Sequence, residues 1–126
     1  MGRIKLREVP AMIIDTHCHL VSPKYGDMEE VRRNSIALGV GHCISQGTGP
    51  HDWEGTLELT TRWPDFVSSC LAVHPSDCTE ASDEDFARMA ELCRKHPQAA
   101  IGETGLDYFW DPPEGWSTEA YYARQR

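Results

Sequence analysis

The segment Asp15-Thr16-His17-Cys18-His19 carries three side chains that can bind or orient a metal ion. Side chains alternate along a β-strand, so Asp15, His17 and His19 are expected on one face. The Cα atoms of the two histidines would lie about 6.6 Å apart. Both imidazoles could then reach one ion at about 2.0–2.1 Å. Asp15 could orient an imidazole or assist as a ligand, although the pattern also fits a polar strand end that faces water.

A second chemical feature is Glu103, an acid at the C-terminal end of a strand of small residues. A carboxylate there is unfavourable unless a positive group meets it, so Glu103 is the natural partner for a cation. Gly102 and Gly105 suit either close backbone approach or an irregular strand end. Asp107 is expected to orient a metal ligand through a hydrogen bond or, more simply, to brace the loop that follows.

A third feature is His74, which ends another apolar run and precedes Pro75. Alone, such a histidine is usually structural. In a barrel of parallel strands, however, the C-terminal strand ends gather on one face, where active sites lie. On that arrangement His74 would meet His17, His19 and Glu103.

The elements that must position these residues follow a strand-helix rhythm. Each of four apolar or small-residue runs is followed by turn residues and a stretch with helical period. This alternation is typical of right-handed βαβ units and a parallel sheet. The four expected strands cover residues 11–20, 40–48, 66–74 and 99–107.

Helix boundaries between the runs are also visible. Asp27 is a candidate N-cap with Glu30 three residues later, and the second helix is expected to stop at Trp63-Pro64. Ser82 and Asp85 fit a capping box at the start of the third helix. The sequence thus predicts a helix after each of the first three strands.

The predicted fold is α/β, the N-terminal half of a (β/α)8 TIM-type barrel with about four βα units. A complete barrel takes about 250 residues, and residues 118–126 begin a helix that lacks a stop signal. We therefore expect an N-terminal extension over residues 1–10 and a partial barrel over 11–126, truncated in helix 4. A doubly wound sheet is the alternative, but residues 20–27 contain no GxGxxG phosphate loop.

Composition narrows the class of protein. The 126 residues are 40% hydrophobic and 25% charged, with a formal net charge of −8. This places the chain among globular domains and argues against a passive nucleic-acid binder, though not against a metallonuclease. The five cysteines lack a CxxC pair and are expected as free thiols. Without a signal h-region or an apolar span, the expected location is the cytoplasm and no membrane partner is expected.

Three motifs together resemble a known family, the TatD-type metal-dependent hydrolases. They are Met12-Ile13-Ile14-Asp15-Thr16-His17-Cys18-His19-Leu20, Ala72-Val73-His74-Pro75 and Ile101-Gly102-Glu103-Thr104-Gly105-Leu106-Asp107-Tyr108. They occur in the family's order and at suitable separations, and the likeness extends to about Arg126. Thr104 departs mildly from the pattern, which often has an aliphatic residue there.

The resemblance implies a (β/α)8 barrel with one or two divalent ions (Zn, Mg or Mn), acting as a deoxyribonuclease or related phosphodiesterase. His17, His19 and Glu103 would then bind metal, and His74 would lie near a substrate phosphate of DNA. The family completes this site with two further histidines and an aspartate general base. These are expected beyond Arg126, so no catalytic base is assigned within the chain, and the isolated fragment is expected to be inactive.

Other interpretations stay open on the sequence. An amidohydrolase acting on a C–N bond also uses HxH on its first strand, but typically places a metal-bridging lysine where this chain has Glu103. A histidinol-phosphatase-like enzyme begins similarly without the third motif. The chain could also be a non-catalytic truncated fragment. Its open sheet edges and exposed apolar surface would then favour self-association.

Overall fold

The computed structural model describes residues 12–126, so the predicted extension over residues 1–10 lies outside the described residues. Helices alternate with strands along the chain, as predicted. The elements are β1 (Ile13–Cys18), α1 (Met28–Ala37), β2 (Val40–Gly47), α2 (Trp53–Arg62), β3 (Val67–Leu71), the 3-10 turn η1 (Pro75–Asp77), α3 (Asp83–Lys95), β4 (Ala100–Ile101) and α4 (Thr118–Gln125).

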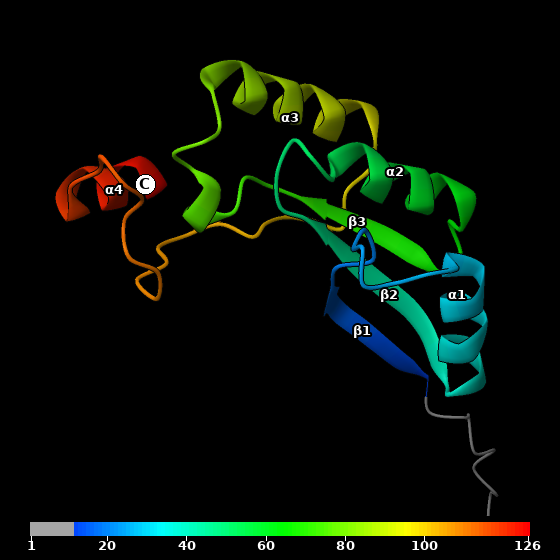
Figure 1. The fold of residues 1–126 in the computed structure, drawn as a ribbon. Helices are drawn as coiled ribbons and strands as arrows, with labels where there is room; N and C mark the ends of the chain where they lie inside the picture. Colours follow the sequence, from blue (N-terminus) through cyan, green and yellow to red (C-terminus); the bar gives the residue numbers. More distant parts are fainter. Residues whose placement is uncertain (1–11) are drawn as a thin grey trace, which may run out of the picture.

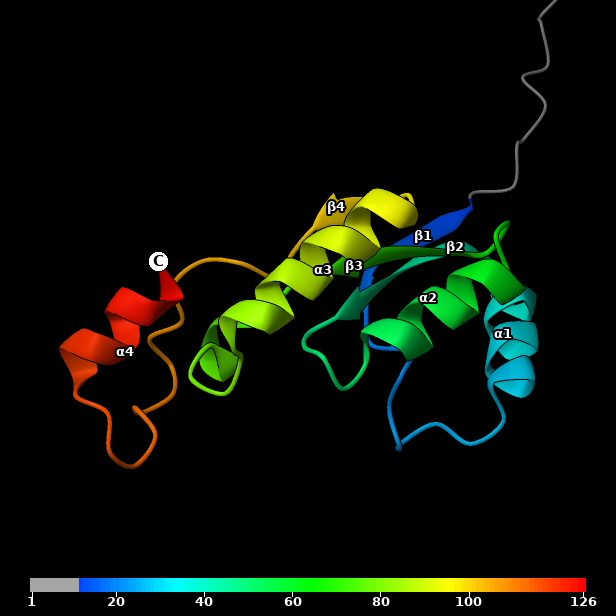
Figure 2. The same cartoon turned by 90° about the horizontal axis from the view of Figure 1, so that it is seen from above.

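The four strands form one parallel sheet in the order β1-β2-β3-β4. Figure 1 shows α1, α2 and α3 on one side of this sheet, and Figure 2 shows the same layering from above. Sequential parallel strands with helices on one face are the arrangement of a (β/α)8 barrel. The described residues therefore form a half-barrel, which confirms the predicted fold class.

The fourth strand is much shorter than predicted. The sequence suggested a strand over residues 99–107, whereas β4 contains only Ala100 and Ile101. The last backbone hydrogen bond to β3 runs from Gly102 N to Leu71 O at 3.3 Å. Beyond it, Gly105 adopts a φ of +126°, which favours glycine and directs the chain away from the sheet. Pairing with β3 thus stops at Gly102, and Glu103 lies in the segment that follows the strand.

The core lies between the sheet and its helices in two groups of buried apolar side chains. Trp53 is fully buried in one group, and its indole N–H donates to Ala72 O at 2.8 Å. This bond ties α2 to the end of β3, just before the segment that carries His74. The two groups contain Leu20, Cys43, Leu59, Trp63, Phe66 and Val67, and Trp53, Leu57, Leu71, Val73 and Ala81.

The helix starts follow the predicted capping chemistry. Asp27 caps α1, as predicted, and its side chain accepts from Glu29 N at 2.9 Å. The Glu30 side chain does not accept from the Asp27 N–H, so the capping box is incomplete. Ser82 and Asp85 form the predicted capping box of α3, each accepting from the other's backbone N–H. These caps fix where each helix begins after its strand.

Two further expectations concern the whole chain. All five cysteines are free thiols, as predicted. Among residues 12–126, no helix combines the length and apolar character that a bilayer span requires.

Candidate metal centre

The end of β1 presents His17 and His19 at the edge of the sheet. Their rings lie 5.2 Å apart between centroids in an edge-to-face arrangement. The strand exit is fixed because Leu20 is buried and its N–H donates to the buried Ser45 hydroxyl at 3.2 Å. Asp15 Oδ1 accepts from His17 N at 3.0 Å. Asp15 therefore braces the backbone at His17, and its predicted contact with an imidazole or a metal stays a prediction.

Glu103 reaches the same place from β4. Cys70 Sγ donates to Gly102 O at 3.3 Å, and a Cβ at Gly102 would lie 3.4 Å from that sulfur, which is ordinary van der Waals contact. The peptide before Glu103 is thus packed directly on β3. From this position the Glu103 carboxylate comes within hydrogen-bonding range of the histidines at the end of β1.

The structure brings the predicted metal ligands together. Glu103 Oε1 lies 3.2 Å from His17 Nε2 and 3.4 Å from His19 Nε2. The three donor atoms of His17, His19 and Glu103, here called the donor cluster, all lie within 4.8 Å of one another. Residues from opposite edges of the sheet therefore offer two nitrogens and one oxygen to a single point.

These donors fit a divalent metal ion. Two ligands about 2.0–2.1 Å from one ion at a tetrahedral angle lie about 3.3 Å apart, close to both observed distances. Glu103 Oε1 is also buried without a hydrogen-bond partner. A buried carboxylate oxygen with no donor is costly unless a cation meets it. The mixed nitrogen and oxygen set suits Zn or Mn and leaves the identity of the metal open.

His74 approaches the other oxygen of the same carboxylate. Its Nε2 lies 3.4 Å from Glu103 Oε2. Its Nδ1 accepts from Ser76 N at 3.2 Å, within the 3-10 turn that follows Pro75. The same nitrogen lies 2.7 Å from the Ser76 hydroxyl oxygen, which in turn donates to Asp77 Oδ1 at 2.9 Å. His74 therefore joins the site, and the residue that orients it, Ser76, was not singled out from the sequence.

Asp107 lies apart from the donor cluster. Its Oδ1 accepts from Phe109 N at 2.9 Å, and its backbone N–H donates to Gln125 Oε1 of α4 at 2.9 Å. The side chain therefore braces the loop, which is the simpler of the two roles expected from the sequence.

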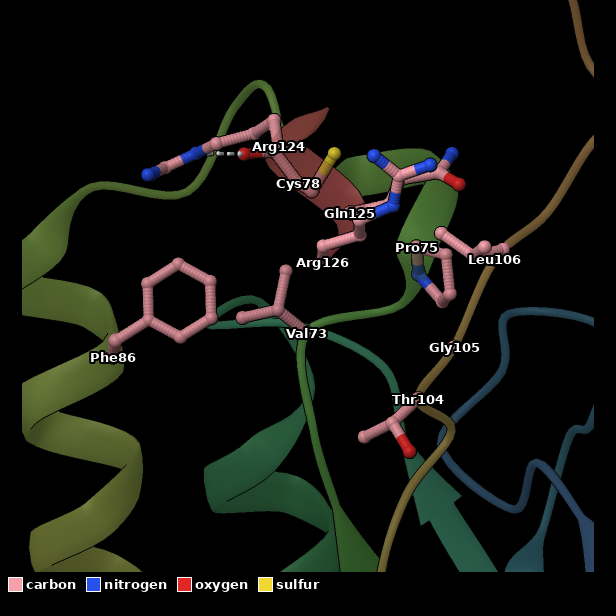
Figure 3. Close-up of a pocket in the computed structure, with 10 residues that line it drawn as sticks. All are labelled: Val73, Pro75, Cys78, Phe86, Thr104, Gly105, Leu106, Arg124, Gln125 and Arg126. Atoms are coloured by element: carbon pink, nitrogen blue, oxygen red, sulfur yellow. Dashed lines mark hydrogen bonds between the residues drawn. The ribbon is translucent and has the colours of Figure 1, made fainter. Parts of the chain in front are cut away.

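A cavity of about 450 Å³ between α3, η1 and α4 has no wall from the donor cluster. Figure 3 shows Arg124 reaching across it to Cys78, whose carbonyl accepts from Nε at 3.1 Å. A second bond, from Arg124 to Ala81 O at 2.9 Å, holds α4 against the segment after His74. This cavity is thus a structural neighbour of the candidate site. Its lining residues are Val73, Pro75, Cys78, Phe86, Thr104, Gly105, Leu106, Arg124, Gln125 and Arg126.

A different cavity, of about 420 Å³, directly adjoins the two histidines. Lys24 and Tyr25, from the loop between β1 and α1, complete its wall. Neither residue was predicted as a site residue from the sequence. The available signal was a cation and an aromatic residue in the loop directly after the HxH motif.

Comparison with known proteins gives a consistent result. The family model "TatD related DNase" matches residues 14–125. The chain is 35% identical over 101 residues to the uncharacterized metal-dependent hydrolase YabD of Bacillus subtilis. It is 30% identical over 106 residues to a 3'-5' ssDNA/RNA exonuclease TatD of Erwinia tasmaniensis.

Solved structures show the same fold. The TatD homologue YjjV of Escherichia coli superposes with a TM-score of 0.74 at 28% identity, covering 89% of this chain and 41% of that one. A TatD family hydrolase of Entamoeba histolytica gives a TM-score of 0.75 at 20% identity, over 90% and 43% of the two chains. The sequence matches cover 79% and 81% of this chain but only 39% of YabD and 41% of the Erwinia protein. The chain thus spans about two fifths of these curated relatives.

Proposed function

This chain belongs to the TatD related DNase family, and from that premise we propose that its donor cluster serves a metal-dependent hydrolase that cleaves phosphodiester bonds in DNA. Two relatives support this substrate class by name, the Erwinia 3'-5' ssDNA/RNA exonuclease and a human deoxyribonuclease, TATDN3. Other relatives are named only as metal-dependent hydrolases.

One observation carries the proposal. Glu103 Oε1 is buried, has no hydrogen-bond partner, and lies 3.2 and 3.4 Å from the Nε2 atoms of His17 and His19. This is the local arrangement that a divalent cation would stabilise.

Each residue of the site then has a defined task. His17, His19 and Glu103 would hold the ion, and His74 Nε2 would orient the second carboxylate oxygen. When bound, a divalent ion supplies an activated water and stabilises charge on the phosphoryl oxygens. Asp15 and Asp107 are not assigned as general base, because one oxygen of each accepts a backbone N–H.

The metal arm of the test is titration calorimetry of the 126-residue chain with Mn²⁺ and Zn²⁺. A double variant, His17→Ala with His19→Ala, should lose metal binding and retain its circular dichroism spectrum, because both side chains are largely exposed. His51→Ala is the matched control, since its side chain is 68% exposed and contacts none of the donor cluster. Unchanged metal content of the double variant in elemental analysis would contradict the assignment.

The activity arm requires a complete barrel. We would join residues 1–126 to the part of YabD that this chain does not match, and measure cleavage of single-stranded DNA with Mn²⁺. The chimera should hydrolyse the DNA, and the histidine double variant should not. Equal cleavage by the two proteins would exclude this donor cluster from the chemistry.

A further inference from the structure

The cavity of about 420 Å³ beside the donor cluster extends beyond the two histidines. Its wall continues from β1 into the loop between β1 and α1, where the side chains change from metal donors to a cation and a phenol. A molecule bound by the donor cluster would therefore extend along this loop. The lining residues are Asp15, His17, Cys18, His19, Ser22, Lys24 and Tyr25.

Lys24 supplies the fixed positive charge of this cavity. Of the described residues that line it, Lys24 is the only lysine or arginine. Its ammonium makes no ion pair with any residue in the described part of the chain. The carboxylate that shares the wall, Asp15, is engaged by His17 N. Lys24 can thus accept an anionic partner such as a phosphate.

The loop that carries Lys24 is held in place by a local turn and by packing against α2. Ser22 forms a turn in which its hydroxyl accepts from Lys24 N at 3.3 Å and its carbonyl accepts from Tyr25 N at 3.1 Å. The preceding Val21 packs on α2 at Gly55, where a Cβ would lie 3.1 Å from either methyl group of the valine. Gly55 therefore permits the close approach that sets the loop beside the cavity.

Tyr25 adds a surface for a base. Its side chain is 41% exposed although it lines the cavity. An exposed aromatic ring next to a phosphate-binding cation is the combination that proteins use for single-stranded nucleic acid, because an unpaired base can stack on the ring.

We propose that Lys24 binds a phosphate of a single-stranded nucleic acid substrate and that Tyr25 stacks on the adjacent base. This inference rests on the proposed function, since it assigns the substrate of the same site. Lys24 is a binding residue in this scheme, and metal binding does not depend on it.

The test uses the 126-residue chain and a fluorescent phosphorothioate hexathymidylate, which resists hydrolysis, in the presence of Mn²⁺. Lys24→Ala should weaken oligonucleotide binding about tenfold, the effect of losing one charge-assisted contact. The slope of log affinity against log salt should fall by about 0.7. Lys24→Arg should restore most of the affinity, and calorimetry should show unchanged Mn²⁺ binding.

Variants of Tyr25 distinguish binding of the base from binding of the phosphate. Tyr25→Ala should weaken the oligonucleotide about fivefold or more through lost stacking, while competition by inorganic phosphate stays unchanged. Tyr25→Phe should retain the affinity, because the ring is kept. Lys24→Ala should weaken the binding of both the oligonucleotide and inorganic phosphate.

Arg33→Ala is the charge-matched control, because Arg33 is exposed and lines neither this cavity nor the donor cluster. Equal losses in Arg33→Ala and Lys24→Ala would overturn the proposal by showing a general charge effect. No oligonucleotide binding by a chain that binds Mn²⁺ would overturn it and leave the metal site intact. Failure to bind Mn²⁺ would instead contradict the proposed function. In that case the oligonucleotide affinities of the unchanged chain and of Lys24→Ala would be compared in EDTA. A weaker variant would support the role of Lys24, and equal affinities would overturn it.

Discussion

His74 Nε2 lies 3.4 Å from Glu103 Oε2, the carboxylate oxygen that the other two histidines leave free. One carboxylate thus meets imidazoles from two strand ends on its two oxygens. This relationship divides the roles, because His17 and His19 face Oε1, whereas His74 fixes the direction in which Oε1 points.

His74→Ala should therefore weaken metal binding without abolishing it. Loss of a group that orients a ligand typically costs about 10- to 100-fold in metal affinity, and calorimetry with Mn²⁺ would measure it. Ser76→Ala removes the hydroxyl that lies 2.7 Å from His74 Nδ1 but keeps the imidazole beside Glu103, so it should have a smaller effect. Complete loss of binding in His74→Ala would make His74 a ligand.

Glu103→Gln tests the carboxylate itself. The variant keeps the size of the side chain but removes the charge that a cation requires, so metal affinity should fall by at least about tenfold. In metal-free buffer the variant should unfold at the same or a higher urea concentration, because Oε1 has no hydrogen-bond partner to lose. A large loss of stability without metal would show that Glu103 is mainly structural.

Much of this arrangement could be predicted from the sequence. The alternation of runs and helices, together with Asp27 and Ser82 as caps, was sufficient for a half-barrel. Strand periodicity and strand-end placement were sufficient to bring His17 and Glu103 together. Each of these inferences depends on local chemistry or on a general rule of parallel sheets.

Other features required coordinates. β4 ends at Ile101, well before the predicted end of the strand, because glycines inside a strand pattern do not specify where pairing stops. Asp15 was expected to orient an imidazole or bind the metal, and the bond that its Oδ1 accepts from His17 N could not be read from the strand pattern. Lys24 and Tyr25 lie in a loop without periodicity, so only the packing of Val21 on Gly55 shows which surface they face.

Gly47 is a packing position at the end of β2. A Cβ there would lie 2.7 Å from Leu71 Cδ2, and Leu71 is fully buried and cannot move away freely. Gly47→Ala should therefore destabilise the fold by about 1–3 kcal/mol through overpacking, measured by urea unfolding. Gly26→Ala is the control, since nothing lies within 4 Å of its Cβ position, and should change stability by less than about 0.5 kcal/mol. Equal effects would contradict the packing argument.

The Cys18 thiol should be unreactive in the folded chain. Burial, followed by the nearby Cys43 and Asp15, raises its pKa from 9.0 to about 12. A raised pKa disfavours the thiolate, so at pH 9 the folded chain ionises far less of Cys18 than the unfolded chain does. Iodoacetamide labelling followed by peptide mass spectrometry should show slow modification that accelerates in urea. It should also accelerate as the pH rises toward 12. Rapid labelling of Cys18 at pH 9 without urea would contradict this environment.

The sheet edges predict self-association of the 126-residue chain. β1 pairs only with β2 and β4 only with β3 within the described residues, so each leaves a strand edge unpaired. Apolar side chains are exposed there, including Ile13 at 53%, Ile14 at 51% and Ile101 at 54%. Exposed edges with apolar residues promote pairing between chains.

Small-angle scattering over a concentration series should therefore give a molecular mass above 14.2 kDa that rises with concentration. Replacing Ile14 with lysine should lower the association, because a charge on an edge strand opposes pairing. Glu91→Lys, which adds a lysine on the exposed surface of α3, is the control and should not lower it. A monodisperse monomer at every concentration would show that these edges do not bind one another.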